Sequence, residues 1–225
     1  MHHYSNNILI KLPNPKDHKQ SFGEEIANSI SHGVGFLLAL TAAPFLIISA
    51  ARHGNPAGVV GACVFAVTTI ILYFTSALYH GIGHNKAKRI FRVLDHCAIF
   101  LLIAGTYTPF TLGVIRGAWG WTMLGLVWSM AVLGIVFKSI RGVKYSKLST
   151  FIYLAMGWLV IIAIKPLLLN MEFWGLFWLA SGGGAYTLGV VFYAARKIPY
   201  GHLIWHLFVI TGTACHFIAV LRYAA

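Results

Sequence analysis

The chain is poor in charged residues, which make up only 10% of its 225 amino acids. Soluble domains carry about 25% charged residues, so a soluble globular protein is excluded. Asp and Glu are the scarcest, with five in total, which leaves a formal net charge of +12. In a soluble chain that charge would suggest nucleic-acid binding. Here Lys and Arg lie between apolar segments, so we predict no nucleic-acid partner.

Cysteine is also scarce, and the three cysteines are Cys63, Cys97 and Cys215. Their odd number and their spacing favour neither a disulfide framework nor a cysteine-based zinc motif. The N-terminal stretch lacks the layout of a signal peptide, because its apolar run "ILI" is too short. We therefore expect residues 1–25 to be retained as a cytoplasmic N-terminal tail.

Long apolar runs dominate what remains, since 58% of the residues are hydrophobic. A spanning helix needs about 20 mostly apolar residues, whereas a membrane barrel strand needs about 10 residues that alternate. The runs have the helical length and do not alternate. We predict an all-α integral membrane protein, a seven-transmembrane helix bundle that occupies residues 26–225 as one domain. The expected spans are residues 26–50, 57–80, 90–114, 118–137, 149–169, 173–195 and 202–222.

The distribution of Lys and Arg predicts the orientation of these spans. Cytoplasmic loops carry an excess of both residues. With the N-terminus inside, thirteen of the 17 lie in inner segments and three, Arg52, Arg116 and Arg222, lie outside. The last, Lys165, lies near the outer end of the fifth span. We therefore predict a cytoplasmic N-terminus and a C-terminus outside. This topology is the reverse of that of G-protein-coupled receptors.

Three spans place polar side chains at the same end. The second span ends in "TSALYH", so Ser76 and His80 lie near its cytoplasmic end. Asp95 lies about one turn into the third span, and His202 and His206 open the seventh. Because neighbouring spans run in opposite directions, these five residues should lie at about the same membrane depth.

Two of these histidines are four residues apart, so the imidazoles of His202 and His206 leave the same helix face. An imidazole from His80 completes a set of three nitrogen ligands. Catalytic zinc uses three protein ligands, leaves the fourth position to water or substrate, and lowers the pKa of the bound water to about 7. The pattern predicts a Zn²⁺ site. Asp95 would orient a ligand or accept a proton there, with Ser76 beside it.

Other interpretations of these residues stay open. Histidines near the headgroup level are common without a metal. Asp95 can instead pair with Arg92, three residues earlier on the same helix. Ser76 can serve helix packing or donate to its own backbone. His216 lies ten residues beyond His206 and points in another direction, so we expect it to make an interhelical hydrogen bond instead.

A further polar stripe opens the first span. Glu25, Asn28 and His32 are three and four residues apart, which places them on one helix face. They can form the turn at which the helix enters the membrane, where acidic residues are favoured. Alternatively, they can orient the ligands of the zinc site.

Together, four motifs resemble a known family. They are "EEIANSISHGVG", "SALYH", "LDHCAIFLLIAGTYTPF" and "GHLIWHLFVITGTACHF". Over residues 20–222 the chain resembles bacterial hemolysin III-type proteins of the progestin and adipoQ receptor family. The resemblance implies a seven-helix bundle with zinc held near the cytoplasmic face by His80, His202 and His206. It also implies that Ser76 and Asp95 lie nearby, and that membrane-embedded ceramidases are distant kin.

Three functions follow as hypotheses. The first is a zinc-dependent hydrolase of a membrane lipid, which cleaves an amide or an ester with ceramidase-like chemistry. The second is a non-enzymatic membrane-homeostasis or lipid-sensing protein with structural zinc. The third, a hemolysin-like cytolysin, is disfavoured because the chain has no soluble face. In each case the expected ligand is a membrane lipid or a fatty-acid-like molecule. No soluble hormone is expected, because the tails of the chain are short.

Overall fold

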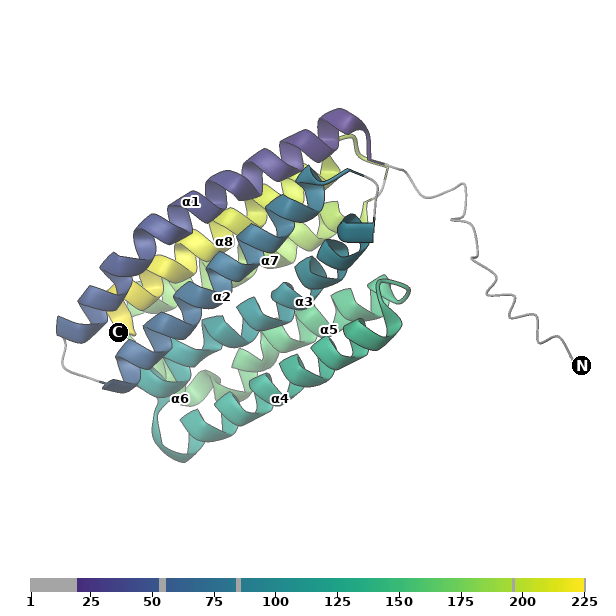
Figure 1. The fold of residues 1–225 in the computed structure, drawn as a ribbon. Coiled ribbons are helices and arrows are strands. Elements are labelled where there is room, and N and C mark those ends of the chain that lie inside the picture. Colours follow the sequence, from purple (N-terminus) through teal and green to yellow (C-terminus); the bar gives the residue numbers. More distant parts are fainter. Residues whose placement is uncertain (1–19, 53–55, 84–85, 196, 225) are drawn as a thin grey trace, which may run out of the picture.

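The computed structural model of the protein describes residues 20–52, 56–83, 86–195 and 197–224 (Figure 1). Most of the expected tail, residues 1–19, lies outside the described residues. Almost every described residue is helical, and no strand occurs among them. Seven helical segments are long and apolar enough to cross a membrane. The prediction of an all-α, seven-span protein is therefore confirmed, whereas the cytoplasmic position of the N-terminus stays a prediction.

The seven segments match the expected spans to within four residues at each end. Two of them contain an interruption and are built from more than one helical element. The segments are α1 (Phe22–Arg52), α2 (Pro56–Gly81), α3 with η1 (Lys86–Pro109 and Phe110–Ile115), α4 (Gly117–Arg141), α5 with η2 and α6 (Ser146–Trp158, Leu159–Ala163 and Ile164–Asn170), α7 (Phe173–Ala194) and α8 (Gly201–Tyr223).

The first helix begins four residues earlier than expected. Ser21 and Glu24 form a capping box, in which each residue satisfies a backbone N–H of the other. The N–H of Ser21 donates to Glu24 Oε2 over 2.7 Å, and the N–H of Glu24 donates to Ser21 Oγ over 3.2 Å. Glu24 and Glu25 therefore belong to the first turn of α1 rather than to the preceding tail.

The two interruptions follow from proline chemistry. Pro109 ends α3, and the chain continues as the π-helix η1. Pro166 lacks an N–H, so the carbonyl one turn earlier loses its helical donor, and the 3-10 segment η2 occupies that turn. The hydroxyl of Tyr107 stabilises this break. It donates to Gly157 O and accepts from the N–H of Val160, both over 2.8 Å.

The spans pack as an antiparallel bundle (Figure 1). α1 packs against both α2 and α8, α7 packs against α8, and α4 covers α3 and α5. The first helix thus contacts both the helix that follows it in the sequence and the last helix of the chain. We call the end of the bundle at which α1, α3 and α8 begin, and α2 finishes, the histidine end. The outer surface carries exposed apolar side chains such as Phe45, Ile140 and Leu169, as expected for contact with lipid.

Candidate metal centre

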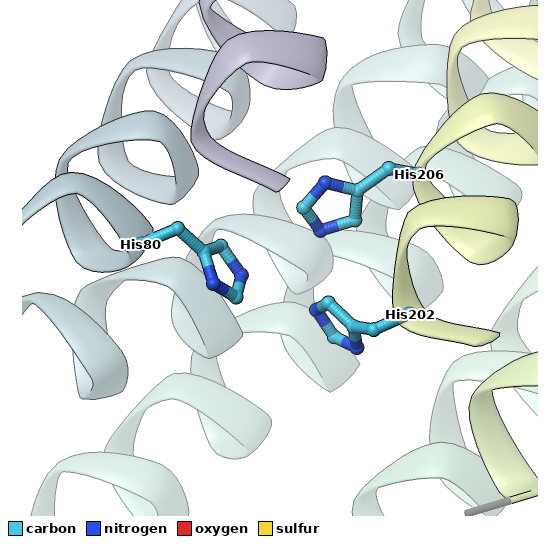
Figure 2. A group of neighbouring side chains, drawn as sticks. All are labelled: His80, His202 and His206. Atoms are coloured by element: carbon cyan, nitrogen blue, oxygen red, sulfur yellow. The ribbon is translucent and has the colours of Figure 1, made fainter. Parts of the chain in front are cut away.

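Three histidines gather at the histidine end, one from α2 and two from α8 (Figure 2). The ring centroids of His202 and His206 are 4.6 Å apart, and those of His80 lie 5.0 and 5.1 Å from them. A ligand nitrogen from each ring lies within 4.8 Å of the other two. The rings of His80 and His206 are buried, and His202 is half-buried. The expected convergence of these three residues is therefore present.

The orientation of His80 is set by a carboxylate on α1. The Nδ1 of His80 lies 2.8 Å from Oε2 of Glu25, so this nitrogen carries the proton and donates. The other ring nitrogen, Nε2, then carries no proton and has a lone pair that can bind a metal ion. It is buried and has no hydrogen-bond partner among the described residues. Histidines that bind metals commonly have this arrangement, in which one ring nitrogen donates to a carboxylate and the other binds the metal.

His206 is held in a similar way by the backbone of α1. Its Nδ1 lies 3.3 Å from the carbonyl oxygen of Asn28 and 3.1 Å from the hydroxyl of Ser31. Because a carbonyl only accepts, Nδ1 is the donor, which leaves Nε2 of His206 as a lone-pair nitrogen. The ring of His32 stacks on His206, with centroids 3.5 Å apart and an interplanar angle of 9°. Both nitrogens of His32 are buried and lack a hydrogen-bond partner among the described residues.

Asp95 and Ser76 lie next to the histidines. Asp95 is buried, interacts electrostatically with His80 and lies beside the Ser76 hydroxyl. Ser76 is also buried and, unlike its neighbour Thr75, does not donate to a backbone carbonyl of its own helix. Among the described ion pairs, Asp95 approaches the Nδ1 of His96 at 3.6 Å rather than Arg92. A carboxylate on α3 and, beside it, a hydroxyl on α2 therefore lie near His80.

The residues present fit a zinc ion. Zinc prefers imidazole nitrogens, and a catalytic site needs three protein ligands with a fourth position free. The structure provides three imidazoles and a fixed tautomer on two of the rings. The Nε2 of His80 is buried and has no hydrogen-bond partner within residues 20–52, 56–83, 86–195 and 197–224. No cysteine or further carboxylate belongs to the set of potential ligands found among the described residues.

Similarity to known proteins identifies the family of this chain. The family described as "Haemolysin-III related" matches residues 20–217, which is most of the chain. The chain belongs to this family. The resemblance drawn from the four sequence motifs is thereby confirmed.

Similar proteins occur in bacteria and in animals. The chain is 50% identical over 200 residues to the "Hemolysin-3 homolog" of Bacillus subtilis (strain 168), which covers 89% of this chain and 94% of that protein. It is 48% identical over 200 residues to "Hemolysin-3" of Bacillus cereus, covering 89% and 91%. It is 31% identical over 172 residues to the human "Monocyte to macrophage differentiation factor", covering 72% and 69%. No solved structure matches.

In this family member an apolar cavity lies beside the histidines. It has a volume of about 150 Å³ and lies between α1, α2 and α8. The cavity is lined by the same faces of α1 and α8 that carry His32 and His206, about one helical turn further along. Gly35 follows His32 by three residues, and Ile210 follows His206 by four. The ring of Tyr73 lines the cavity and meets His32 edge-on at 5.1 Å. Tyr73 and His32 therefore separate the cavity from the three histidines.

Four residues around the site were missed by the sequence analysis. Ser31 binds His206, and Tyr73 closes the cavity toward His32. Lys88 pairs with Oε1 of Glu25 over 3.0 Å, while the other oxygen of Glu25 binds His80. Glu24 contacts the start of α8. Of these, only Glu24 had a signal, because "SFGE" is the pattern of a capping box.

Proposed function

We propose that this protein is a zinc-dependent hydrolase of a membrane lipid, in the inner membrane of a bacterium and with the histidine end toward the cytoplasm. The bond cleaved is an amide or an ester. The observation that carries the proposal is the buried Nε2 of His80, which has no hydrogen-bond partner in the part of the chain that the structure describes. The ring of His80 lies close to two further imidazoles, and Asp95, which has the Ser76 hydroxyl beside it, interacts electrostatically with His80.

His80, His202 and His206 would hold the zinc. A polar atom buried without a partner is costly, and a metal ion is one of the explanations that such an atom demands. Zinc in this position would polarise a carbonyl and make water acidic enough to lose a proton near neutral pH. Three ligands leave room for a substrate, which supports a catalytic over a structural site.

Asp95 would act as the acid–base group. It is buried and interacts electrostatically with His80, and its one ion pair among the described residues is the 3.6 Å approach to Nδ1 of His96. A carboxylate held this loosely can take a proton from water. The same group can then return the proton to the leaving amine or alkoxide. Ser76 would orient the substrate or the water through its hydroxyl, since it does not donate to the helix backbone.

The cavity supports a lipid as the ligand. It opens between α1 and α8 beside the exposed residues Leu38 and Ala214, so an apolar chain can enter from the membrane. A cavity of about 150 Å³ lined by apolar side chains takes a ring or chain of roughly six carbons. A membrane lipid or fatty-acid-like molecule could place its chain there, and a displacement of Tyr73 and His32 would then bring its polar group to the histidines.

One observation favours the second candidate, a non-enzymatic lipid sensor with structural zinc. Structural zinc sites are closed by four protein ligands. His32 is a fourth buried imidazole directly against His206, with neither nitrogen hydrogen-bonded among the described residues. A rotation of the His32 side chain that brought one nitrogen into the cluster would close the site.

The test combines metal content with turnover. Detergent-purified protein should contain about one zinc per chain, and a panel of ceramides, glycerolipids and lipid esters should reveal a hydrolysed substrate. The Asp95→Asn variant should keep the zinc and lose about 10²- to 10⁴-fold in turnover, the usual contribution of acid–base catalysis. Zinc at full occupancy without hydrolysis of any lipid would favour the sensor, and His32→Ala should then lower zinc affinity strongly.

A further inference from the structure

Glu24 connects the beginnings of two helices that are far apart in the sequence. Its Oε1 accepts a hydrogen bond from the backbone N–H of Tyr200 over 2.8 Å. Its Oε2 accepts from the N–H of Ser21 in the capping box of α1 over 2.7 Å. The side chain is buried, with 7% of the residue exposed. One carboxylate therefore lies at the N-termini of both α1 and α8, where the helix dipoles favour a negative charge.

Tyr200 needs such support because of its conformation. It caps α8 with φ 56° and ψ 17°, in the left-handed region that residues with a Cβ rarely adopt. Its own side chain makes no capping hydrogen bond to the helix. A Cβ added to Gly23 would lie 3.2 Å from the Tyr200 hydroxyl, so the two segments also touch through this side chain. The N-terminal turn of α1 thus holds the turn that starts α8.

The position of this contact matters for the metal centre. His202 lies two residues after Tyr200, and His206 one helical turn further. The neighbouring residue Glu25 binds His80 on α2. Two consecutive carboxylates of α1 therefore reach the two helices that carry the three histidines, Glu24 on the α8 side and Glu25 on the α2 side.

We propose that Glu24 is a positioning residue for the metal centre, which sets the place of His202 by holding the Tyr200 turn against α1. This inference rests on the proposed zinc site but concerns a residue that does not touch the metal. Groups that orient metal ligands typically contribute 10- to 100-fold to metal affinity. The loss of the Glu24 carboxylate should cause a loss in that range.

The experiment uses the full chain in detergent with four variants. Glu24→Ala removes the acceptor, whereas Glu24→Gln keeps an oxygen that can accept from Tyr200. Ser21→Ala breaks the capping box of α1 but leaves the contact with α8 intact. Glu172→Ala is the matched control, since Glu172 is an exposed acid at the N-cap of α7 that makes no capping hydrogen bond.

Two readouts are needed. Competition with a chromophoric chelator gives the zinc dissociation constant, and Glu24→Ala should weaken binding by about 10- to 100-fold. Glu24→Gln should recover most of this loss, and Glu172→Ala should match the wild type. Amide hydrogen exchange on zinc-free protein gives the second readout. In Glu24→Ala the peptide that contains Tyr200 and His202 should exchange about tenfold faster, with little change in α4.

The two readouts separate this inference from the proposed function. If the wild type binds no zinc, the proposed function fails, and hydrogen exchange still decides whether Glu24 holds the start of α8. Unchanged exchange around Tyr200 in Glu24→Ala overturns the positioning role, whatever the zinc affinity. An equal loss of zinc affinity in Ser21→Ala and Glu24→Ala also overturns it, because the effect would then come from the α1 cap alone.

Discussion

The two halves of α8 use the same residue type in different ways. His206 in the first half and His216 in the second are both buried. The Nδ1 of His206 donates to α1, and its ring faces two other imidazoles. The Nε2 of His216 instead donates to the carbonyl of Leu179 on α7 over 3.1 Å, which confirms the expected interhelical hydrogen bond.

The comparison shows that burial alone does not identify a metal ligand in a membrane protein. A polar ring within the bilayer needs a partner, and a backbone carbonyl serves as well as a metal. What distinguishes the first half of α8 is the convergence of several imidazoles from α2 and α8. The second half contributes one imidazole, that of His216, which packs against Gly182 of α7.

The largest expected contrast comes from removing each of these two rings. His206→Ala should reduce zinc content from about one per chain to below about one tenth, because two imidazoles alone hold zinc weakly. His216→Ala should keep the wild-type content. Metal analysis by mass spectrometry on protein purified without added zinc measures both. Equal zinc loss in the two variants would remove the distinction between the two halves.

The second largest effect is expected from the carboxylate of Glu25, which orients the ring of His80. Glu25→Ala should weaken zinc binding by about 10- to 100-fold, because the ring of His80 loses the acceptor that fixes its tautomer. Lys88→Ala should cost less, since Lys88 pairs with the oxygen of Glu25 that does not bind His80. Chelator competition measures both constants. A larger effect for Lys88 than for Glu25 would contradict this order.

Substitutions against the second half of α8 should lower the stability of the protein and leave metal binding unchanged. A Cβ at Gly182 would overlap the ring of His216, so Gly182→Ala should destabilise the protein by about 1–3 kcal/mol, as overpacked cores do. Gly183→Ala is the matched control, because nothing lies within 4 Å of its added Cβ. Thermal unfolding in detergent compares the two. Zinc content should be the same in both.

The smallest effect is expected for a single hydroxyl in the same region. The hydroxyls of Tyr186 and Thr213 are 2.8 Å apart, and Tyr186 lies near His216. Tyr186→Phe should lower stability by about 0.5–1.5 kcal/mol, the net value of one hydrogen bond, and leave zinc binding unchanged. A measurable drop in zinc affinity would show that the two halves are coupled.

Much of this arrangement follows from local sequence. A spanning helix is defined by its length and hydropathy, which is why the seven spans were predicted to within four residues. The spacing of His202 and His206 determines that both rings share a face. Because the spans alternate in direction, His80 had to lie at the same end. The break at η2 was not predicted, since it depends on a hydroxyl from Tyr107 in another span as well as on Pro166.

The lateral order of the helices depends on how they pack in three dimensions. Local sequence predicts that polar residues meet at one end of a seven-helix bundle, because depth depends on each helix alone. It does not predict that α1 packs against both α2 and α8, with Glu25 against His80 and Glu24 against Tyr200. Those contacts join residues far apart in the chain. They arise from side-chain packing between helices, which no local pattern encodes.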